Sequence, residues 1–562
     1  MTAATATTAA RGARGYLTRF LPSRRDYDGL RGSWRTDVLS GITVGIVALP
    51  LALAFGVSSG VGAEAGLITA VVAGLVAAVM GGSHVQVSGP TGAMVVVLAP
   101  VVAAHGAGSI ALVSVMAGLL VIILGISGLG RAVAFIPWPV VEGFTLGIAA
   151  IIFLQQVPMA TGTEGIPGHN TVLAAVESAA RATAPTVLQT LAIVAGVAAV
   201  MLLLPRLNKA IPASLAAVLL ATVAAELLDL QIPRIGSLPH SLAAPSLPAL
   251  DPSVLGGLLM PAVSIATLAA IESLLSARVA AGMVGPDGRP TGTYSPDREL
   301  TGQGLASVAA GFFGGMPATG AIARTAVNVR SGAKTRLSAI VHALVLLAII
   351  YVAAGLVGRI PLAVLAGILM VTATRMVSRQ TVAAVMRSTR ADAFVFVLTA
   401  LITVAFDLIV AIEIGLVAAA VFTLRKFASL SGVQREDIPG PAVPGDRHIA
   451  IFRLDGAMFF GAAERVLQEI SQVKDIQVAI IRLSQVRMLD ATGAHTLVDV
   501  ISALELRGVT VLLKGVQPQH LDLVTNVGVI RSLRHHKHLF ASLPEAVEHA
   551  RSHVVRNAAA SA

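Results

Sequence analysis

A carboxylate and a guanidinium occur in stretches of this sequence that are otherwise apolar. Glu272 stands in "IATLAAIESLLSARVA" at residues 265–280, and Arg324 stands in "GGMPATGAIARTAV" at residues 314–327. A charged side chain at the centre of a lipid bilayer costs about 2.5–3.5 kcal/mol on insertion scales, so such residues usually face protein or a water-filled cavity. We therefore expect Glu272 to face an interior cavity and not lipid.

Glu272 and Ser276 are four residues apart, so they share one face of a helix. A carboxylate in such a position could take up and release a proton. Beside an anion site, proton uptake would remove a repulsive charge and favour entry of the anion, which is the logic of proton–anion symport. The alternative is a structural ion pair in which Glu272 and Arg324 neutralise each other. The two interpretations are compatible.

An internal repeat surrounds these charges. The stretch "VQVSGPTGAMVV" at residues 85–96 resembles residues 314–327, and each contains Thr-Gly-Ala, at Thr91-Gly92-Ala93 and at Thr319-Gly320-Ala321. The separation of the two stretches is close to half of the apolar region. This spacing predicts two related halves, the second inserted upside down relative to the first.

Proline interrupts both repeated stretches, at Pro90 and Pro317. We expect each proline to begin a half-helix whose first N–H groups have no intrahelical partner. Two such N-termini meeting in mid-membrane offer roughly half a positive charge each, which favours an anion. Arg324 would add a full charge. Chance similarity is the alternative, because Pro and Gly are common in membrane helices.

The composition indicates a membrane protein. Of 562 residues, 55% are hydrophobic and 12% are charged, whereas a soluble chain carries about 25% charged residues. Apolar runs of spanning or half-spanning length recur about fourteen times. These runs cover residues 38–57, 66–82, 87–104, 108–127, 133–155, 185–204, 211–228, 259–281, 303–315, 320–330, 336–356, 361–378, 393–410 and 412–427. An even number of spans places both termini on one side.

Basic residues predict which side that is. With a cytoplasmic N-terminus, the outside loops hold only Arg181, Arg234 and Arg359, and the other basic residues of the membrane region fall inside. This topology in the cell membrane explains most of the net charge of +10 without a nucleic-acid partner. The chain has no cysteine, which excludes disulfides and thiolate metal sites.

The sequence changes character after about residue 427, where Pro, Gly and charged residues become frequent. Strands are expected at 448–456, 477–486 and 509–516 and helices at 462–473 and 493–508, which predicts a small cytoplasmic α/β domain. The expected boundaries are a basic tail at 1–35, a membrane domain at 36–427 with repeats at 36–228 and 259–427, a linker at 428–446, the α/β domain at 447–555 and a disordered tail at 556–562.

Several long motifs in order resemble the SulP/SLC26 family of anion transporters, and the C-terminal domain resembles the STAS domain of those proteins. The motifs are "TDVLSGITVGIVALPLALAFGVSSG" (36–60), "VQVSGPTGAMVV", "IPWPVVEGFTLGIAA", "AAIESLLSA" (269–277) and "ELTGQGLASVAAGFFGGMPATGAIARTAVNVRSGAKTRLSAI" (299–340). The resemblance implies a polytopic α-helical fold of about 14 spans in a seven-plus-seven inverted repeat, with core and gate domains, and a homodimer held partly by the STAS domains.

The resemblance also implies a substrate site between the third and tenth spans, next to an acid in the eighth. The matching substrate residues are Thr91, Gly92, Ala93, Gly320, Ala321 and Arg324, and the matching ion-coupling residues are Glu272 and Ser276. Sodium-coupled relatives tend to have Asp and two Thr where this chain has Glu272, Ser276 and Ile322, so the coupling ion is expected to be a proton more than sodium.

The function expected from these features is transport of a small inorganic anion, sulfate or bicarbonate. The alternatives are C4-dicarboxylate symport with protons, and an anion-gated channel or sensor that signals through the STAS domain. No nucleophile–base pair or P-loop is found, so an enzyme is not expected, and no cofactor or metal is expected either. The closely spaced histidines of "RHHKH" at 534–538 are expected to form an exposed basic surface, with a metal site as the less favoured alternative, because no cysteine or clear carboxylate partner accompanies them.

"MLDATGAH" in the STAS part resembles the phosphorylated turn of anti-sigma-factor antagonists, which would make Asp490 and Thr492 regulatory residues. Ordinary N-capping by Asp490 is the favoured explanation.

Overall fold

The computed structural model describes most of the chain, in two compact units, Met1–Leu416 and Val417–Ala562. The described residues are 19–130, 136–163, 171–183, 186–208, 211–238, 241–242, 244–248, 252–286, 288, 290–406, 408–430, 432–458 and 475–561.

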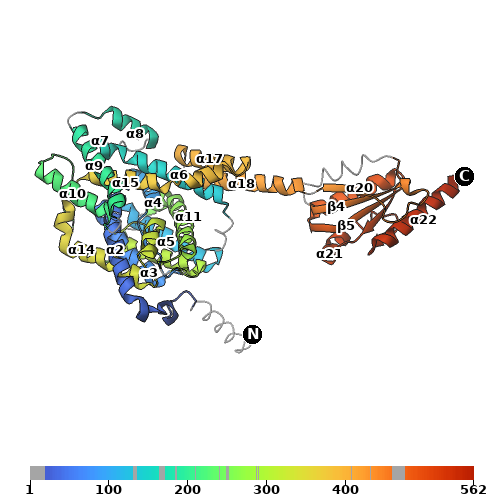
Figure 1. Cartoon of the computed structure of the whole chain (residues 1–562), viewed down its shortest axis with the longest axis horizontal. Coiled ribbons are helices and arrows are strands. Elements are labelled where there is room, and N and C mark those ends of the chain that lie inside the picture. Colours follow the sequence, from blue (N-terminus) through green and yellow to red (C-terminus); the bar gives the residue numbers. More distant parts are fainter. Residues whose placement is uncertain are drawn as a thin grey trace. The chain divides into compact units, whose positions relative to one another are not determined.

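Each of the fourteen predicted apolar segments corresponds to a helix (Figure 1). All of these helices belong to the first unit except the last, which continues into the second. These helices are α2 (Leu30–Ser58), α3 (Ala63–Met80), α4 (Gly92–His105), α5 (Ser109–Ile126), α6 (Trp138–Gln155), α9 (Thr186–Leu207), α10 (Ala213–Leu227), α11 (Pro252–Gly282), α12 (Pro296–Phe312), α13 (Ile322–Arg330), α14 (Leu337–Gly358), α15 (Leu362–Met376), α17 (Arg390–Ala405) and α18 (Leu408–Leu430). Shorter helices not predicted are η1 (Arg24–Tyr27), α7 (Val157–Thr161), α8 (Thr171–Ala180) and α16 (Arg379–Met386).

Helix length separates full spans from half-spans. Among the described residues, eight helices are long and apolar enough to cross a membrane. By contrast, α4 has 14 residues and α13 has 9. At about 1.5 Å per residue neither reaches across a hydrocarbon core of about 30 Å. Both are therefore half-helices, as the interrupted sequence predicts.

The helices pack in two groups. In the first, α12 packs on α5 and α3, and α14 packs on α2 and α3. In the second, α17 packs on α6, and α9 packs on α10 and α15. The α5–α12 contact is especially close, because a Cβ added to Gly118 or to Gly304 would lie 2.7 or 2.6 Å from the other glycine's carbonyl oxygen. Small residues at helix crossings give this approach in membrane proteins.

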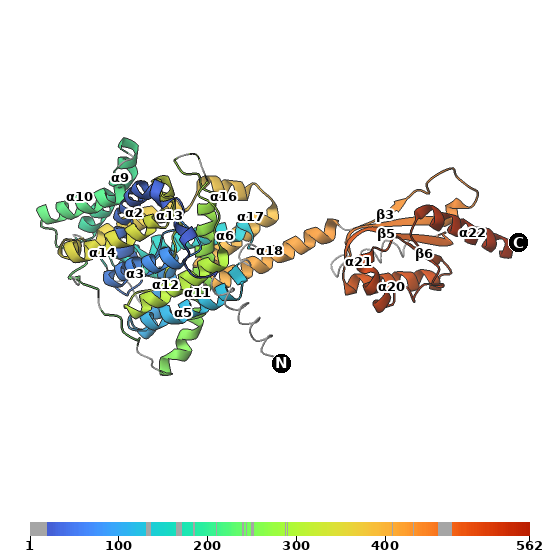
Figure 2. The same ribbon diagram turned by 90° about the horizontal axis from the view of Figure 1, so that it is seen from below.

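The second unit is an α/β domain built on a five-stranded sheet. The strand order is β3-β4-β5-β6-β7, with β3 antiparallel to β4 and the other pairs parallel. The strands are β3 (Gly432–Glu436), β4 (Ile449–Met458), β5 (Val478–Leu489), β6 (Thr510–Lys514) and β7 (Leu539–Phe540). Helices α20 (Ala491–Leu506) and α21 (Pro518–Val527) cover one face, and α22 (Leu543–Ser561) covers the other (Figure 2).

Alternation along the strands explains the two covered faces. On β4, Ala450 and Phe452 face α20, whereas Ile449 and Ile451 face α22. Successive strand side chains point to opposite faces of a sheet, so a strand that is apolar on both must be covered twice. The three predicted strands are β4, β5 and β6.

Two predicted boundaries in this part of the chain differ from the structure. The predicted linker at 428–446 contains the end of α18 and strand β3, because residues 432–436 pair with β4. The predicted disordered tail at 556–562 instead continues α22, which extends to Ser561. The helix predicted at 462–473 lies outside the described residues.

The predicted basic tail at 1–35 also contains ordered structure from residue 19 on. Asp26 accepts hydrogen bonds from both terminal nitrogens of Arg298, each at 2.8 Å, and lies 3.7 Å from Arg336. Burial alone would raise the pKa of Asp26, but the Arg298 and Ser23 N–H hydrogen bonds and the Arg336 charge outweigh it and lower the pKa to about 2. Arg298 and Arg336, expected as loop cations, are therefore buried partners of the N-terminal segment.

We expect Asp26→Asn to lower the free energy of unfolding by about 3–5 kcal/mol, because it leaves Arg298 buried without its counter-charge. The melting temperature of the detergent-solubilised chain measures this loss. A carboxylate whose pKa is lowered on folding stabilises the fold above its unfolded pKa of about 3.9. The gap between native and variant should therefore be constant near neutral pH and narrow below about pH 4.

Exposed Asp28 supplies the control, since Asp28→Asn changes the same charge two residues away. An equal loss in both variants would contradict a specific role for the Asp26–Arg298 pair.

Candidate anion-binding site

The two interrupted segments of the sequence meet as a two-stranded antiparallel sheet. Strand β1 (Ser88–Gly89) pairs with β2 (Thr319–Gly320), with Ser88 opposite Gly320. Beyond it, the Ala321 N–H donates to the Val87 carbonyl at 2.9 Å, and the Val87 N–H donates to the Thr325 hydroxyl at 3.0 Å. These bonds hold the starts of α4 and α13 beside each other.

Both half-helices begin without a side-chain cap. Thr91 is the N-cap residue of α4 and Ala321 that of α13, and neither side chain accepts a hydrogen bond from its helix. The first N–H groups of a helix have no intrahelical acceptor and carry the positive end of the helix dipole. Two uncapped N-termini therefore lie next to one another, and an anion is the ligand that suits them.

Glu272 on α11 joins the two half-helix segments. Its Oε2 accepts hydrogen bonds from the hydroxyls of Thr91 and Thr319, each at 2.8 Å, and those hydroxyl oxygens lie 3.1 Å apart. Thr91 and Thr319 are buried, and Glu272 is half-buried. The side chain that would otherwise cap α4 is thus turned to the carboxylate.

Arg324 lies on the first turn of α13 and is 2% exposed. Its Nη2 donates to the Pro90 carbonyl at 2.5 Å, and its Nη1 has no hydrogen-bond partner among the described residues. No ion pair joins Arg324 to Glu272 in the described part of the chain. The alternative of mutual neutralisation by direct contact therefore does not hold in this structure, and one guanidinium nitrogen remains available.

The remaining predicted site residues lie close by with different roles. Ser276 is buried, and its hydroxyl lies 3.4 Å from that of Thr325 and not against Glu272. Gly92 and Gly320 are packed closely against neighbouring side chains. A Cβ added to Gly92 would lie 2.2 Å from Ile152 Cδ1, and one added to Gly320 would lie 1.6 Å from Gln86 Nε2. Ala93 is buried just inside α4.

Residues that match between the two sequence repeats do not occupy matching positions in the structure. Thr91 is an N-cap residue, but its sequence equivalent Thr319 lies in β2, before the N-cap of its helix. The prolines do not themselves begin the helices, because α4 starts at Gly92 and α13 at Ile322, each after a strand. Strand β1 precedes Pro90, whereas β2 lies between Pro317 and α13, so the proline breaks alone do not predict the strand pairing.

Sequence reasoning missed two contributors. Thr319 belongs to the recognised repeat, and its symmetry with Thr91 could have added it to the site. Ser273 accepts the Gly320 N–H at 3.1 Å through its hydroxyl, and its carbonyl accepts from Gln86 Nε2 at 3.3 Å. A serine next to an intramembrane acid carries no distinguishing signal, so only the fold reveals it.

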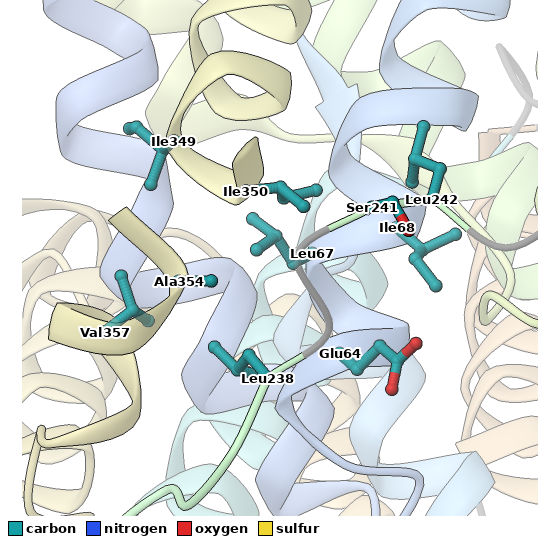
Figure 3. A pocket seen from close by; sticks show the side chains of 10 residues that line it. All are labelled: Glu64, Leu67, Ile68, Leu238, Ser241, Leu242, Ile349, Ile350, Ala354 and Val357. Carbon is teal, nitrogen blue, oxygen red and sulfur yellow. The ribbon is translucent and has the colours of Figure 1, made fainter. Parts of the chain in front are cut away.

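A separate pocket lies between α3, α14 and the segment residues Leu238, Ser241 and Leu242 (Figure 3). Its wall is formed by apolar side chains such as Leu67, Ile349 and Val357, with Glu64 at the edge. None of the described residues that line it is basic, so it offers an anion no counter-charge.

In the second unit, Asp490 caps α20 by accepting the Gly493 N–H at 2.7 Å. Thr492 is exposed in the first turn of that helix, and its phosphorylation stays a prediction. The expected basic surface at 534–538 is only partly exposed, because His538 is 4% exposed and lies among other histidines.

Comparison with known sequences decides the family. The sulfate permease family pattern matches residues 34–399, and the STAS domain pattern matches residues 440–546. The chain belongs to the sulfate permease family. "Putative sulfate transporter YvdB" of Bacillus subtilis (strain 168) is 33% identical over 89% of this chain and 95% of its own length. Bicarbonate transporter BicA of Picosynechococcus sp. is 32% identical over 83% of this chain and 86% of its own.

Solved structures agree with this placement of the permease. The transmembrane domain of a cyanobacterial BicA matches with a TM-score of 0.59 at 32% identity, over 69% of this chain and 97% of that chain. SLC26A9 matches with a TM-score of 0.77 over 93% and 91%, and its 18% identity shows the fold alone. The predicted polytopic helical fold with a STAS domain is confirmed. This permease belongs to a family of sulfate and bicarbonate anion transporters, not of enzymes.

Thr91→Val and Thr319→Val should each lower the free energy of unfolding by about 1.5–3 kcal/mol, because each removes a hydrogen bond to a charged group. The double variant should differ from the sum, because both hydroxyls serve one oxygen and the second loss leaves it without a donor. Melting temperatures of the four chains complete the cycle.

Thr145→Val is the matched control for this cycle, since the Thr145 hydroxyl donates only within its own helix, to the Val141 carbonyl at 2.9 Å. Additive losses in the double variant would contradict a shared role at Glu272.

Proposed function

We propose that this permease is a secondary active transporter of a small inorganic anion, of the sulfate or bicarbonate class, driven by proton symport through alternating access. The anion binds at the N-termini of α4 and α13, between the third and tenth spans. The main support for the proposal is the buried Arg324 guanidinium, which lies beside two uncapped helix N-termini. Its Nη1 has no hydrogen-bond partner among the described residues.

Positive charge from three sources supports anion binding. The two helix ends contribute roughly half a unit each, and Arg324 contributes a full unit in a buried setting where charge is screened little. Backbone N–H groups of Gly92, Ala93 and Ile322 belong to these helix ends and would donate to the anion. Backbone donors of this kind bind an anion without requiring a polar side chain at these positions.

The Glu272 carboxylate supports proton coupling. Its hydrogen bonds to Thr91 and Thr319 place it at the same two segments that would hold the anion. The ionised form repels an anion there and the protonated form does not, so proton and anion bind with positive coupling. A carrier that changes its access only when it is empty or holds both proton and anion then lets a proton gradient drive anion uptake.

Sodium fits these residues less well than a proton. Sodium favours a shell of several oxygens, whereas Ile322 supplies a hydrocarbon side chain and the Ser276 hydroxyl contacts Thr325. A proton needs only the carboxylate.

The first test is uptake of labelled sulfate and fumarate into proteoliposomes, with and without an inward proton gradient. Bicarbonate is measured by counterflow at equal alkaline pH, because a gradient would convert it to carbon dioxide. We expect the gradient to accumulate the inorganic anion in the native chain. Glu272→Gln should keep counterflow but lose accumulation above equilibrium, because its amide cannot exchange a proton.

Glu142→Gln is the control, since Glu142 is a second half-buried intramembrane carboxylate, held by Trp138 Nε1 at 3.0 Å. Gradient-driven accumulation by Glu272→Gln would overturn proton coupling through this residue. Accumulation of fumarate instead of sulfate would favour the dicarboxylate alternative, and a rapid unsaturable flux would favour a channel.

We further propose that the permease lies in the cell membrane with both termini and the STAS domain in the cytoplasm. Because the chain has no cysteine, single cysteines are clean reporters. On intact cells, a membrane-impermeant maleimide should label Arg359→Cys, in an exposed turn after α14, but not Ala541→Cys in the STAS domain. Permeabilised cells should show both labelled. Labelling of Ala541→Cys on intact cells would contradict this topology and place the STAS domain outside the cell.

The resemblance of the STAS domain to those of other family members supports a homodimer. The mass of the detergent-solubilised chain, compared with a chain ending at Leu430, tests both the dimer and the contribution of this domain. A monomeric full-length chain would contradict the proposal.

A further inference from the structure

Three histidines that are separated in the sequence come together in the STAS domain. His538 immediately precedes β7, and His549 and His553 lie on α22. One nitrogen from each ring lies within 4.8 Å of the others. His549 and His553 have the tightest contact, with 3.2 Å between their Nε2 atoms.

The setting of His538 is unusual for a histidine. The residue is 4% exposed, and its Nδ1 is buried without a hydrogen-bond partner among the described residues. Its ring centre lies 5.5 Å from that of His549 and 5.4 Å from that of His553. A buried polar atom without a partner costs free energy, so such an atom calls for an explanation.

The helix presents its two histidines in a chelating arrangement. Residues four apart on a helix lie one above the other on one face, the spacing used by helical zinc ligands. Here that face adjoins the apolar stripe of Ala546 and Ala550, which packs on the sheet. The backbone on the other side is also fixed, because the Leu513 N–H donates to the His538 carbonyl at 2.8 Å.

We propose that His538, His549 and His553 form a binding site for a divalent late transition metal ion of the zinc class. Imidazole suits zinc, copper and nickel, and no cysteine exists in the chain to favour a thiolate site. Zinc–nitrogen bonds of about 2.0–2.1 Å in a tetrahedron place the nitrogens roughly 3.3 Å apart, close to the 3.2 Å between His549 and His553. Rotation of the His538 ring closes the triad.

The bound ion would fasten the C-terminal helix to the sheet. His538 is tied to β6 through its backbone, and the other two ligands belong to α22. Three protein ligands leave the fourth tetrahedral position for water or for a further side chain. A metal ion that binds the folded domain but not the unfolded chain stabilises the fold by mass action.

The test uses the full-length chain, purified in detergent without a polyhistidine tag and stripped with a chelator. After dialysis against zinc, the native chain should retain about one zinc ion per chain and melt at a higher temperature than without zinc. Cobalt in place of zinc should give the visible absorption of a tetrahedral ion.

His549→Gln with His553→Gln should abolish retained zinc, the zinc-dependent rise in melting temperature and the cobalt spectrum. The control removes two other imidazoles, by His495→Gln with His536→Gln, both of which are exposed, and should leave all three unchanged. Equal melting temperatures of native and variant chains in chelator establish that the variants fold.

A native chain that retains no zinc after dialysis overturns the proposal, and this measurement depends on no variant. Equal losses of zinc in the two double variants overturn it as well, because they would indicate adventitious surface binding.

Discussion

The hydrogen bonds from Thr91 and Thr319 to one oxygen of Glu272 are the interaction on which the site depends. They join the two broken spans to a continuous helix and fix the direction of a charge that the bilayer would otherwise exclude. The backbone pairing of β1 with β2 would by itself bring the half-helices together, but it would not fix the orientation of the Glu272 carboxylate. Side-chain and backbone bonds together make a polar centre in an apolar unit.

Part of this centre can be read from residue types. A lone acid in an apolar run, a repeated Thr-Gly-Ala and an arginine after a proline break each carry a physical reason, and the structure brings Glu272, Thr91 and Arg324 to one place. The partners could not be deduced in the same way. Mutual neutralisation of Glu272 and Arg324 is reasonable from charge alone, but each finds other hydrogen bonds once the backbone carbonyl of Pro90 is within reach.

The fold shows the same division. Hydropathy locates each of the fourteen long or half-length apolar helices named above, because the span length is set by the bilayer. It does not reveal that Arg298 and Arg336 turn inward to Asp26, since a basic residue beside a span looks the same whether it faces water or a buried carboxylate. The burial of His538 escapes sequence reasoning for a related reason. The residues just before it are exposed, as expected, and only the packing of α22 brings His549 and His553 to His538.

The glycine contact between α5 and α12 has a mechanical consequence. Backbones that touch without side chains between them have no layer of flexible rotamers to shear, so these two helices resist sliding past each other. Helix α11, which carries Glu272, packs on α4, on α13 and on both members of this pair, and α4 also packs on α5. An anion bound at the polar centre would therefore stay with this stiff group of helices, which meets α6 through α4 and is connected to α10 and α15 through α2.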